Sequence, residues 1–211
     1  MIAVNNLHSA LTEKTSVLHK IAERSGFNKV LFEGKATREM YGKYLLHKYH
    51  IYDAIESMMD EHTKNDLFSK FLFPELKRKQ MLADDLNQFI GKGWEKEDQL
   101  STVSSYVYRI HKIAAENPGL LIAHAYVQYF ADLSGGFIIK KILKQQYNYA
   151  ENELNAYAFN QIENVDEFKK NYLDLMNDLV EELQLEDEFI EETKLAYIFT
   201  ISALLELVAA T

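Results

Sequence analysis

The stretch Ala131-Asp132-Leu133-Ser134-Gly135-Gly136 lies inside residues 123–146, a segment otherwise suited to one long buried helix. Each glycine in a helix interior costs about 1 kcal/mol relative to alanine. The carboxylate of Asp132 stands among aromatic and aliphatic residues, where burying a charge is also unfavourable. Departures of this kind concentrate at functional sites, and glycine pairs let a helix kink and its backbone approach a ligand. We therefore expect a glycine-kinked helix with a large planar ligand against it and Asp132 nearby.

The composition of the 211 residues favours long helices in one domain. Only two prolines and eight glycines are present, and the 47% hydrophobic and 26% charged residues are ordinary for a globular protein. The chain has no cysteine, which excludes disulfides, thiolate metal sites and a cysteine nucleophile. We expect a single domain over residues 1–211 with one core.

The net charge of −9 is unevenly distributed along the chain. Residues 151–192 carry fourteen acidic and two basic side chains, whereas residues 1–150 carry seventeen acidic and twenty basic ones. The acidic balance disfavours nucleic-acid binding. No signal peptide or membrane-spanning stretch is recognised, so we expect no membrane association and a cytoplasmic location. The more basic first part suits an acidic protein partner.

Apolar residues recur at three- and four-residue spacing through most of the chain, which is typical of helices that bury one face. The predicted helices are residues 5–24, 37–62, 74–90, 98–116, 123–146, 166–183 and 187–210. Thr37 is a predicted N-cap. Residues 64–71 and 147–161 are predicted connections with short helical turns. Since no segment alternates as a strand does, the fold class is all-α, a bundle of six to eight helices.

The sequence lacks the spacing of glutamate and histidine residues that two classes of metal-dependent protein require. A di-iron carboxylate bundle needs a glutamate three residues before a histidine, and none of the seven histidines has one. The His-Glu-x-x-His zinc motif is also absent. His47 and His50 lie one turn apart, but Lys48 and Tyr49 between them indicate a helix surface or edge rather than a metal site.

His19 borders the apolar face of the first predicted helix, so its imidazole can point into an interior groove. Glu23, one turn later, is placed to accept a hydrogen bond from the ring nitrogen that binds no metal. A neutral histidine is also the usual proximal ligand of haem iron. Taken alone, His19 has a simpler explanation as an interfacial histidine. Asp132 has one too, as a structural carboxylate hydrogen-bonded to Tyr52 or Tyr126.

Taken together, several segments resemble the haem oxygenases along nearly the whole chain. Ala123-His124-Ala125-Tyr126, followed by Asp132-Leu133-Ser134-Gly135-Gly136, is similar to the family's distal-helix signature. Ala10-Leu11, Thr15, His19 and Glu23 resemble the surroundings of the family's proximal histidine. Further similar segments are Tyr49-His50-Ile51-Tyr52, Phe73-Pro74-Glu75-Leu76, Arg78-Lys79, Asp85-Leu86, Phe168-Lys169, Tyr172 and Met176-Asn177.

The resemblance implies a monooxygenase that opens haem to biliverdin and releases carbon monoxide and ferrous iron. Haem is both substrate and cofactor, O2 is consumed, and electrons come from an external donor. The resemblance implies His19 as the axial iron ligand. It implies that Asp132 and Tyr52 hold a proton-delivering network, and that Gly135 and Gly136 bring the helix backbone close to haem.

Other residues are implied in haem binding by the same resemblance. The remaining expected contacts are Glu23, Tyr126, Ala131, Ser134 and Lys169. Of these, Tyr126 and Lys169 are the expected partners of the propionates.

Four positions depart from the family's usual residues. Ala131 stands where a glycine is common, which adds a methyl group beside the haem. Gln128 stands where an arginine is frequent, and this changes the polar network behind Asp132. Thr12 and Leu173 stand where many relatives have basic residues for the propionates.

The resemblance also implies partners. Nothing in the chain binds flavin or nicotinamide, so a ferredoxin or flavodoxin with its NADPH reductase is the expected donor. Such carriers are generally acidic, which matches the basic first part of the chain. The expected docking residues are Lys35, Arg38, Lys43, Lys140, Lys141 and Lys144. No feature indicates an oligomer, so we expect a monomer.

Two alternatives share this kind of fold. A haem-binding or transfer protein keeps the pocket without turnover, but it has no need of a proton network around Asp132. A thiaminase-like protein uses a cysteine nucleophile, which this chain lacks. The sequence therefore favours a haem-degrading enzyme.

Overall fold

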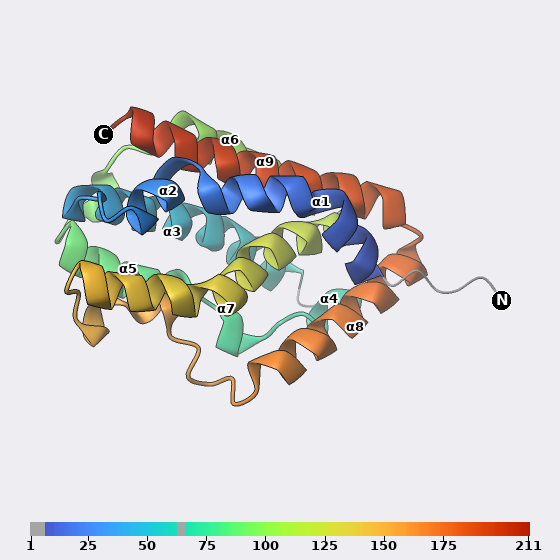
Figure 1. The fold of residues 1–211 in the computed structure, drawn as a ribbon. Helices are drawn as coiled ribbons and strands as arrows, with labels where there is room; N and C mark the ends of the chain where they lie inside the picture. Colours follow the sequence, from blue (N-terminus) through green and yellow to red (C-terminus); the bar gives the residue numbers. More distant parts are fainter. Residues whose placement is uncertain (1–6, 63–65) are drawn as a thin grey trace.

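Helices dominate the computed structural model, which describes residues 7–62 and 66–211; these residues form nine α-helices and five 3-10 helices and contain no strand (Figure 1). The long helices are α1 (Leu7–Arg24), α3 (Arg38–Glu61), α5 (Lys79–Phe89), α6 (Ser101–Glu116), α7 (Leu121–Gln146), α8 (Val165–Leu183) and α9 (Glu186–Ala209). The short ones are α2 (Gly26–Phe32), α4 (Asp66–Ser69), η1 (Pro74–Leu76), η2 (Trp94–Lys96), η3 (Pro118–Leu120), η4 (Glu151–Glu153) and η5 (Asn155–Tyr157). The all-α prediction is confirmed.

The predicted helices correspond to the seven long ones, with one interruption. The predicted helix 74–90 is divided into η1 and α5. Glu56 accepts the backbone N–H groups of Arg78 and Lys79 at 2.6 and 3.2 Å, so a side chain from α3 caps the start of α5. The Arg78 guanidinium donates to the carbonyls of Glu75, Leu76 and Ala158, which holds the break in place.

Helix α2 lies between the predicted helices 5–24 and 37–62, where no helix was predicted. Its first residue, Gly26, has φ +53°, and a Cβ there would lie 2.5 Å from the backbone carbonyl of Leu204 in α9. Only glycine allows both this conformation and this close approach. Two positions of the predicted first helix and part of the predicted connection 64–71 lie outside the described residues.

Helix α3 is central to the bundle and packs against α5, α6, α7 and α9. Its N-cap prediction is confirmed, since the Thr37 side chain accepts the N–H of Met40 at 3.1 Å. Large aromatic side chains fill the core around it, including the fully buried Tyr41, Tyr52 and Tyr106. In Figure 1, α1 lies between α9 and α7, and α9 packs along α1.

Helix α7 is continuous from Leu121 to Gln146 and passes through Gly135-Gly136. The kink at these glycines therefore stays a prediction. Every residue from 121 to 129 is buried, but Phe137 is 75% exposed and Ile138 is 55% exposed. The prediction of a buried helix thus holds for its first half only. None of the described helices is long and apolar enough to cross a membrane.

Candidate functional site

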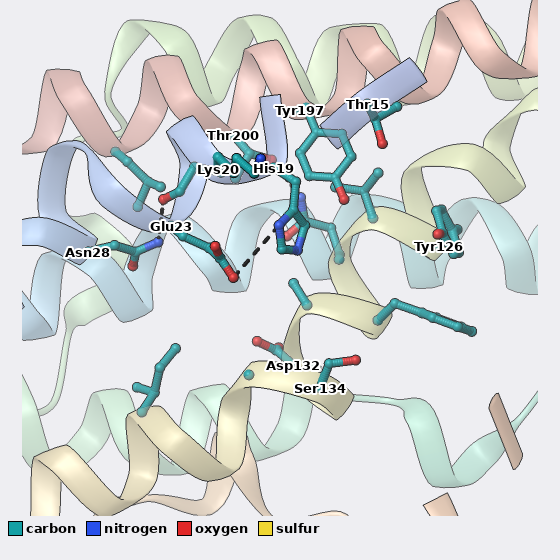
Figure 2. Close-up of a pocket in the computed structure, with 18 of the residues that line it drawn as sticks. Thr15, His19, Lys20, Glu23, Asn28, Tyr126, Asp132, Ser134, Tyr197 and Thr200 are labelled. Atoms are coloured by element: carbon teal, nitrogen blue, oxygen red, sulfur yellow. Dashed lines mark hydrogen bonds and ion pairs between the residues drawn. The ribbon is translucent and has the colours of Figure 1, made fainter. Parts of the chain in front are cut away.

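A cavity of about 680 Å³ lies between α1 and α7, and residues of α2, α3, α8 and α9 also line it. Figure 2 shows His19 reaching from α1 toward α7, where Asp132 and Ser134 lie on the opposite wall. This volume falls within the range of roughly 300–1,000 Å³ that is usual for small-molecule sites. The cavity therefore has room for a sizeable ligand between two helices.

Most of the residues predicted for the site meet in this cavity, although they come from three helices. Those that line it are His19, Glu23, Tyr126, Ala131, Asp132, Ser134, Gly135 and Lys169. Gln128, Thr12 and Leu173, which were noted as departures from the family, line it as well.

Tyr52 and Gly136 do not belong to the cavity lining. Tyr52 is fully buried behind Asp132 and donates its hydroxyl proton to Asp132 Oδ2 at 2.5 Å. A Cβ added to Gly136 would lie 3.1 Å from the ring of Tyr157, so this glycine allows η5 to pack on α7. A Cβ on Gly135 would meet no atom within 4 Å. Only Gly135 of the pair leaves open space toward the cavity.

His19 has a neighbour suited to orient its ring. Its Nδ1 lies 3.7 Å from Oε1 of Glu23, one helical turn away, and both side chains are about half exposed. The Tyr197 ring meets the imidazole edge to face, with centroids 6.1 Å apart. A partner at Nδ1 leaves Nε2 as the ring nitrogen available to a ligand.

Lys48 is a member of the site that the sequence interpretation missed. The prediction of a helix surface or edge at residues 47–50 is wrong for His47 and Lys48, which are buried and line the cavity. Lys48 Nζ lies 2.7 and 2.8 Å from the two carboxylate oxygens of Asp132. Lys48 stands one turn before Tyr52 on the inward side of α3, and this spacing was the available signal.

The electrostatics of this wall follow from burial and pairing. Burial lowers the pKa of Lys48, but Asp132 and Tyr44 raise it by more, so the ammonium stays charged. Burial, followed by the effect of His50, lowers the pKa of His47 to about 4, so this imidazole is neutral near pH 7. Next to them, the amide of Gln128 donates to the hydroxyl of Thr200 at 2.9 Å.

Helices α8 and α7 also contact each other at the cavity lining. Lys169 donates to the hydroxyl of Ser134 at 3.0 Å, and its Nζ lies 6.0 Å from the centre of the Phe130 ring. Lys169 is half-buried, and its ammonium at the cavity lining is placed to meet an anionic group at the rim.

These features define a class of protein: a helical protein with room for a large, flat ligand between two helices. An imidazole stands on one side of the ligand and a buried carboxylate with its donors on the other. Haem fits this cavity, because His19 offers a ring nitrogen to iron, Gly135 leaves space for a macrocycle, and Lys169 offers a cation to a propionate.

Comparisons with known proteins identify the class more closely. The family model described as "Heme oxygenase" matches residues 5–206. Heme oxygenase 1 of Synechocystis sp. is 35% identical over 203 residues, which cover 96% of this chain and 85% of the relative. Heme oxygenase 2 of Oryctolagus cuniculus is 33% identical over 98% of this chain and 67% of the relative.

Solved structures agree with the sequence matches. The crystal structure of Synechocystis heme oxygenase-1 in complex with heme has a TM-score of 0.90 and 34% identity, covering 97% of this chain and 93% of that one. The heme oxygenase of Leptospira interrogans has a TM-score of 0.89 and 32% identity, covering 95% and 99%. The chain belongs to the haem oxygenase family. It is an enzyme that degrades haem to biliverdin, with haem as substrate and prosthetic group, O2, and electrons from a reductant.

The two adjacent glycines provide a matched pair of variants. Gly135→Ala removes a helix penalty and adds a methyl group in open space, so the free energy of unfolding of the ligand-free protein should rise by about 1 kcal/mol. The same methyl group narrows the cavity, so hemin affinity should fall. In Gly136→Ala, contact with Tyr157 offsets the helix gain, and hemin affinity should change less. Urea unfolding and hemin titration measure both effects. A larger loss of hemin affinity in Gly136→Ala than in Gly135→Ala would contradict this assignment.

Proposed function

We propose that haem is held between α1 and α7, where His19 would bind its iron and Asp132, on the opposite wall, would control protons. The observation that carries this proposal is the placement of His19 and Asp132 on opposite walls of one cavity (Figure 2). When bound, haem supplies the iron that binds O2 and passes electrons, and the ring that is opened.

His19 and Glu23 act together on the α1 side. The Glu23 carboxylate orients the imidazole through Nδ1, which presents Nε2 to the iron. Tyr197 packs against the ring edge and limits its rotation.

On the α7 side, buried residues hold Asp132 in a fixed arrangement of hydrogen bonds. Burial, and then Asp132, raises the pKa of Tyr52 well above its usual value, so its hydroxyl remains a donor. Tyr52 donates to Asp132, whose carboxylate reaches the cavity wall. Asp132 in turn holds the water molecules that deliver protons to the reacting oxygen.

The other wall residues position the haem. Lys169 and Tyr126 would contact the propionates, and Ser134 keeps Lys169 in place through their hydrogen bond. The Ala131 methyl group limits the space next to Gly135. Gly136 supports the site indirectly, by letting η5 pack against α7.

Turnover of hemin tests the proposed function. Hemin added to the protein with an electron donor under air should progress to the spectrum of biliverdin. His19→Ala should keep hemin in the pocket but change its spectrum, because the iron would lose the imidazole that His19 provides. A Soret band that persists through many reducing equivalents would favour the non-catalytic haem-binding alternative. A wild-type protein that binds no hemin would contradict both functions.

The role of Asp132 has its own test. Asp132→Asn keeps the size of the side chain but removes the charge that orders the proton donors. We expect normal hemin binding and a biliverdin yield reduced by about tenfold or more, within the range of general acid–base effects. The hydrogen peroxide released per haem should increase. An unchanged yield of biliverdin would refute this role.

We also propose that electrons come from a ferredoxin or flavodoxin with its NADPH reductase, and that the enzyme is a cytoplasmic monomer. The absence of cysteine supports a reducing compartment. Sedimentation of the purified chain tests its oligomeric state. Lys140 and Lys144 both pair with Glu151, and Arg38 pairs with Glu153, so part of the expected docking surface is already neutralised. Exposed pairs of this kind are weak, and an acidic partner can displace them.

Ionic strength tests the docking proposal. Because exposed charges are screened within about 8 Å at physiological salt, raising the salt concentration should slow electron transfer from an acidic carrier. Lys141→Gln should slow it at low salt only, while Lys170→Gln, a lysine on α8 outside the proposed surface, should have little effect. Stopped-flow reduction of the haem complex measures the rates. Rates that do not depend on salt would count against this surface.

A further inference from the structure

The ion pair between Lys48 and Asp132 is unusual because it is buried and also lines the cavity. The two side chains are 10% and 4% exposed, and the ammonium nitrogen contacts both carboxylate oxygens. Lysine is rarely buried unless it is paired. A buried pair of this kind is often no more stabilising than apolar residues of the same size. Stability alone therefore does not account for its position.

Aromatic rings and a short list of titratable groups surround the ammonium. Its nitrogen lies 5.7, 5.3 and 5.9 Å from the ring centres of Tyr44, Tyr52 and Tyr157. These come from α3 and η5, and Asp132 comes from α7. Among the described residues, Asp132 supplies the carboxylate that pairs with Lys48. The ammonium is thus held at this carboxylate and away from bulk water.

Donors from the protein occupy most of the hydrogen-bond acceptor sites of the Asp132 carboxylate. A carboxylate has about four acceptor sites. Lys48 occupies two and Tyr52 a third. About one site is left, and the carboxylate cannot rotate without breaking these bonds.

We propose that Lys48 is a positioning residue for the haem reaction: it fixes the Asp132 carboxylate with one acceptor site free toward the substrate, and it cancels the negative charge of that carboxylate. This inference rests on the proposed function. It implies that the wall opposite His19 is electrically neutral and rich in donors. Loss of Lys48 leaves an uncompensated anion at this wall, and loss of Asp132 leaves an uncompensated cation.

The alkaline transition of the ferric haem complex tests the charge balance, because it adds one negative charge at the iron. In Lys48→Met, the unpaired carboxylate should raise the midpoint by about one pH unit. In Asp132→Asn, the unpaired ammonium should lower the midpoint by a similar amount. The double variant should return close to wild type. Absorbance titration of the hemin complex measures all four midpoints.

Matched variants separate positioning from simple structural damage. Lys79→Met removes a lysine that pairs with Asp53 at 2.5 Å on the surface, and it should leave the midpoint unchanged. Lys48→Arg keeps the charge and should restore the wild-type midpoint at least in part. If Lys48→Met does not fold, Lys48→Gln carries the same expected sign.

The outcomes distinguish this inference from the proposed function. If the midpoint of the alkaline transition shifts with the same sign in both single variants, or in neither, the inference is overturned. If the wild-type chain still binds hemin in that case, the proposed function stands. Failure of the wild-type chain to bind hemin overturns the proposed function and the inference together. Opposite shifts that cancel in the double variant support the inference.

Discussion

The site depends on how one buried carboxylate is satisfied. Asp132 lies on α7 facing the cavity, where an unpaired charge would be costly. Lys48 and Tyr52, one turn apart on α3, provide its partners. The carboxylate therefore ties the central helix to the helix that forms one wall of the cavity. The same contacts fix the direction in which the carboxylate meets a ligand, so the structural role and the proposed chemical role share one set of bonds.

The cavity also requires that α1 and α7 stay apart. Each helix packs against α9 rather than filling the space between them, and the aromatic core lies around α3. Gly136 brings η5 close to α7 on the outer side, while Gly135 leaves the inner side open. Two adjacent glycines thus do different work because they point in different directions from one helix. The two residues are both glycine, so their different roles follow from the directions in which the helix points them.

Much of the fold was predictable because it is repetitive. Apolar residues at helical spacing placed the seven long helices, most of which bury one apolar face, while the first half of α7 is buried on all sides. The break before α5 was not predictable, because it depends on Glu56 from another helix capping Arg78 and Lys79. Helix α2 depends on the close approach of Gly26 to Leu204, a contact between residues far apart in the chain.

The sequence by itself determined the fold class and the resemblance to the haem oxygenases, because helical periodicity and the glycine motif are local patterns. It also named most of the residues that line the cavity, His19 and Asp132 among them. The tertiary structure alone decided that Lys48 is buried against Asp132 and that Gly136 faces Tyr157. The reason is physical: a lone lysine in a helix is normally solvated, and only a carboxylate on a different helix offsets the cost of burying its charge.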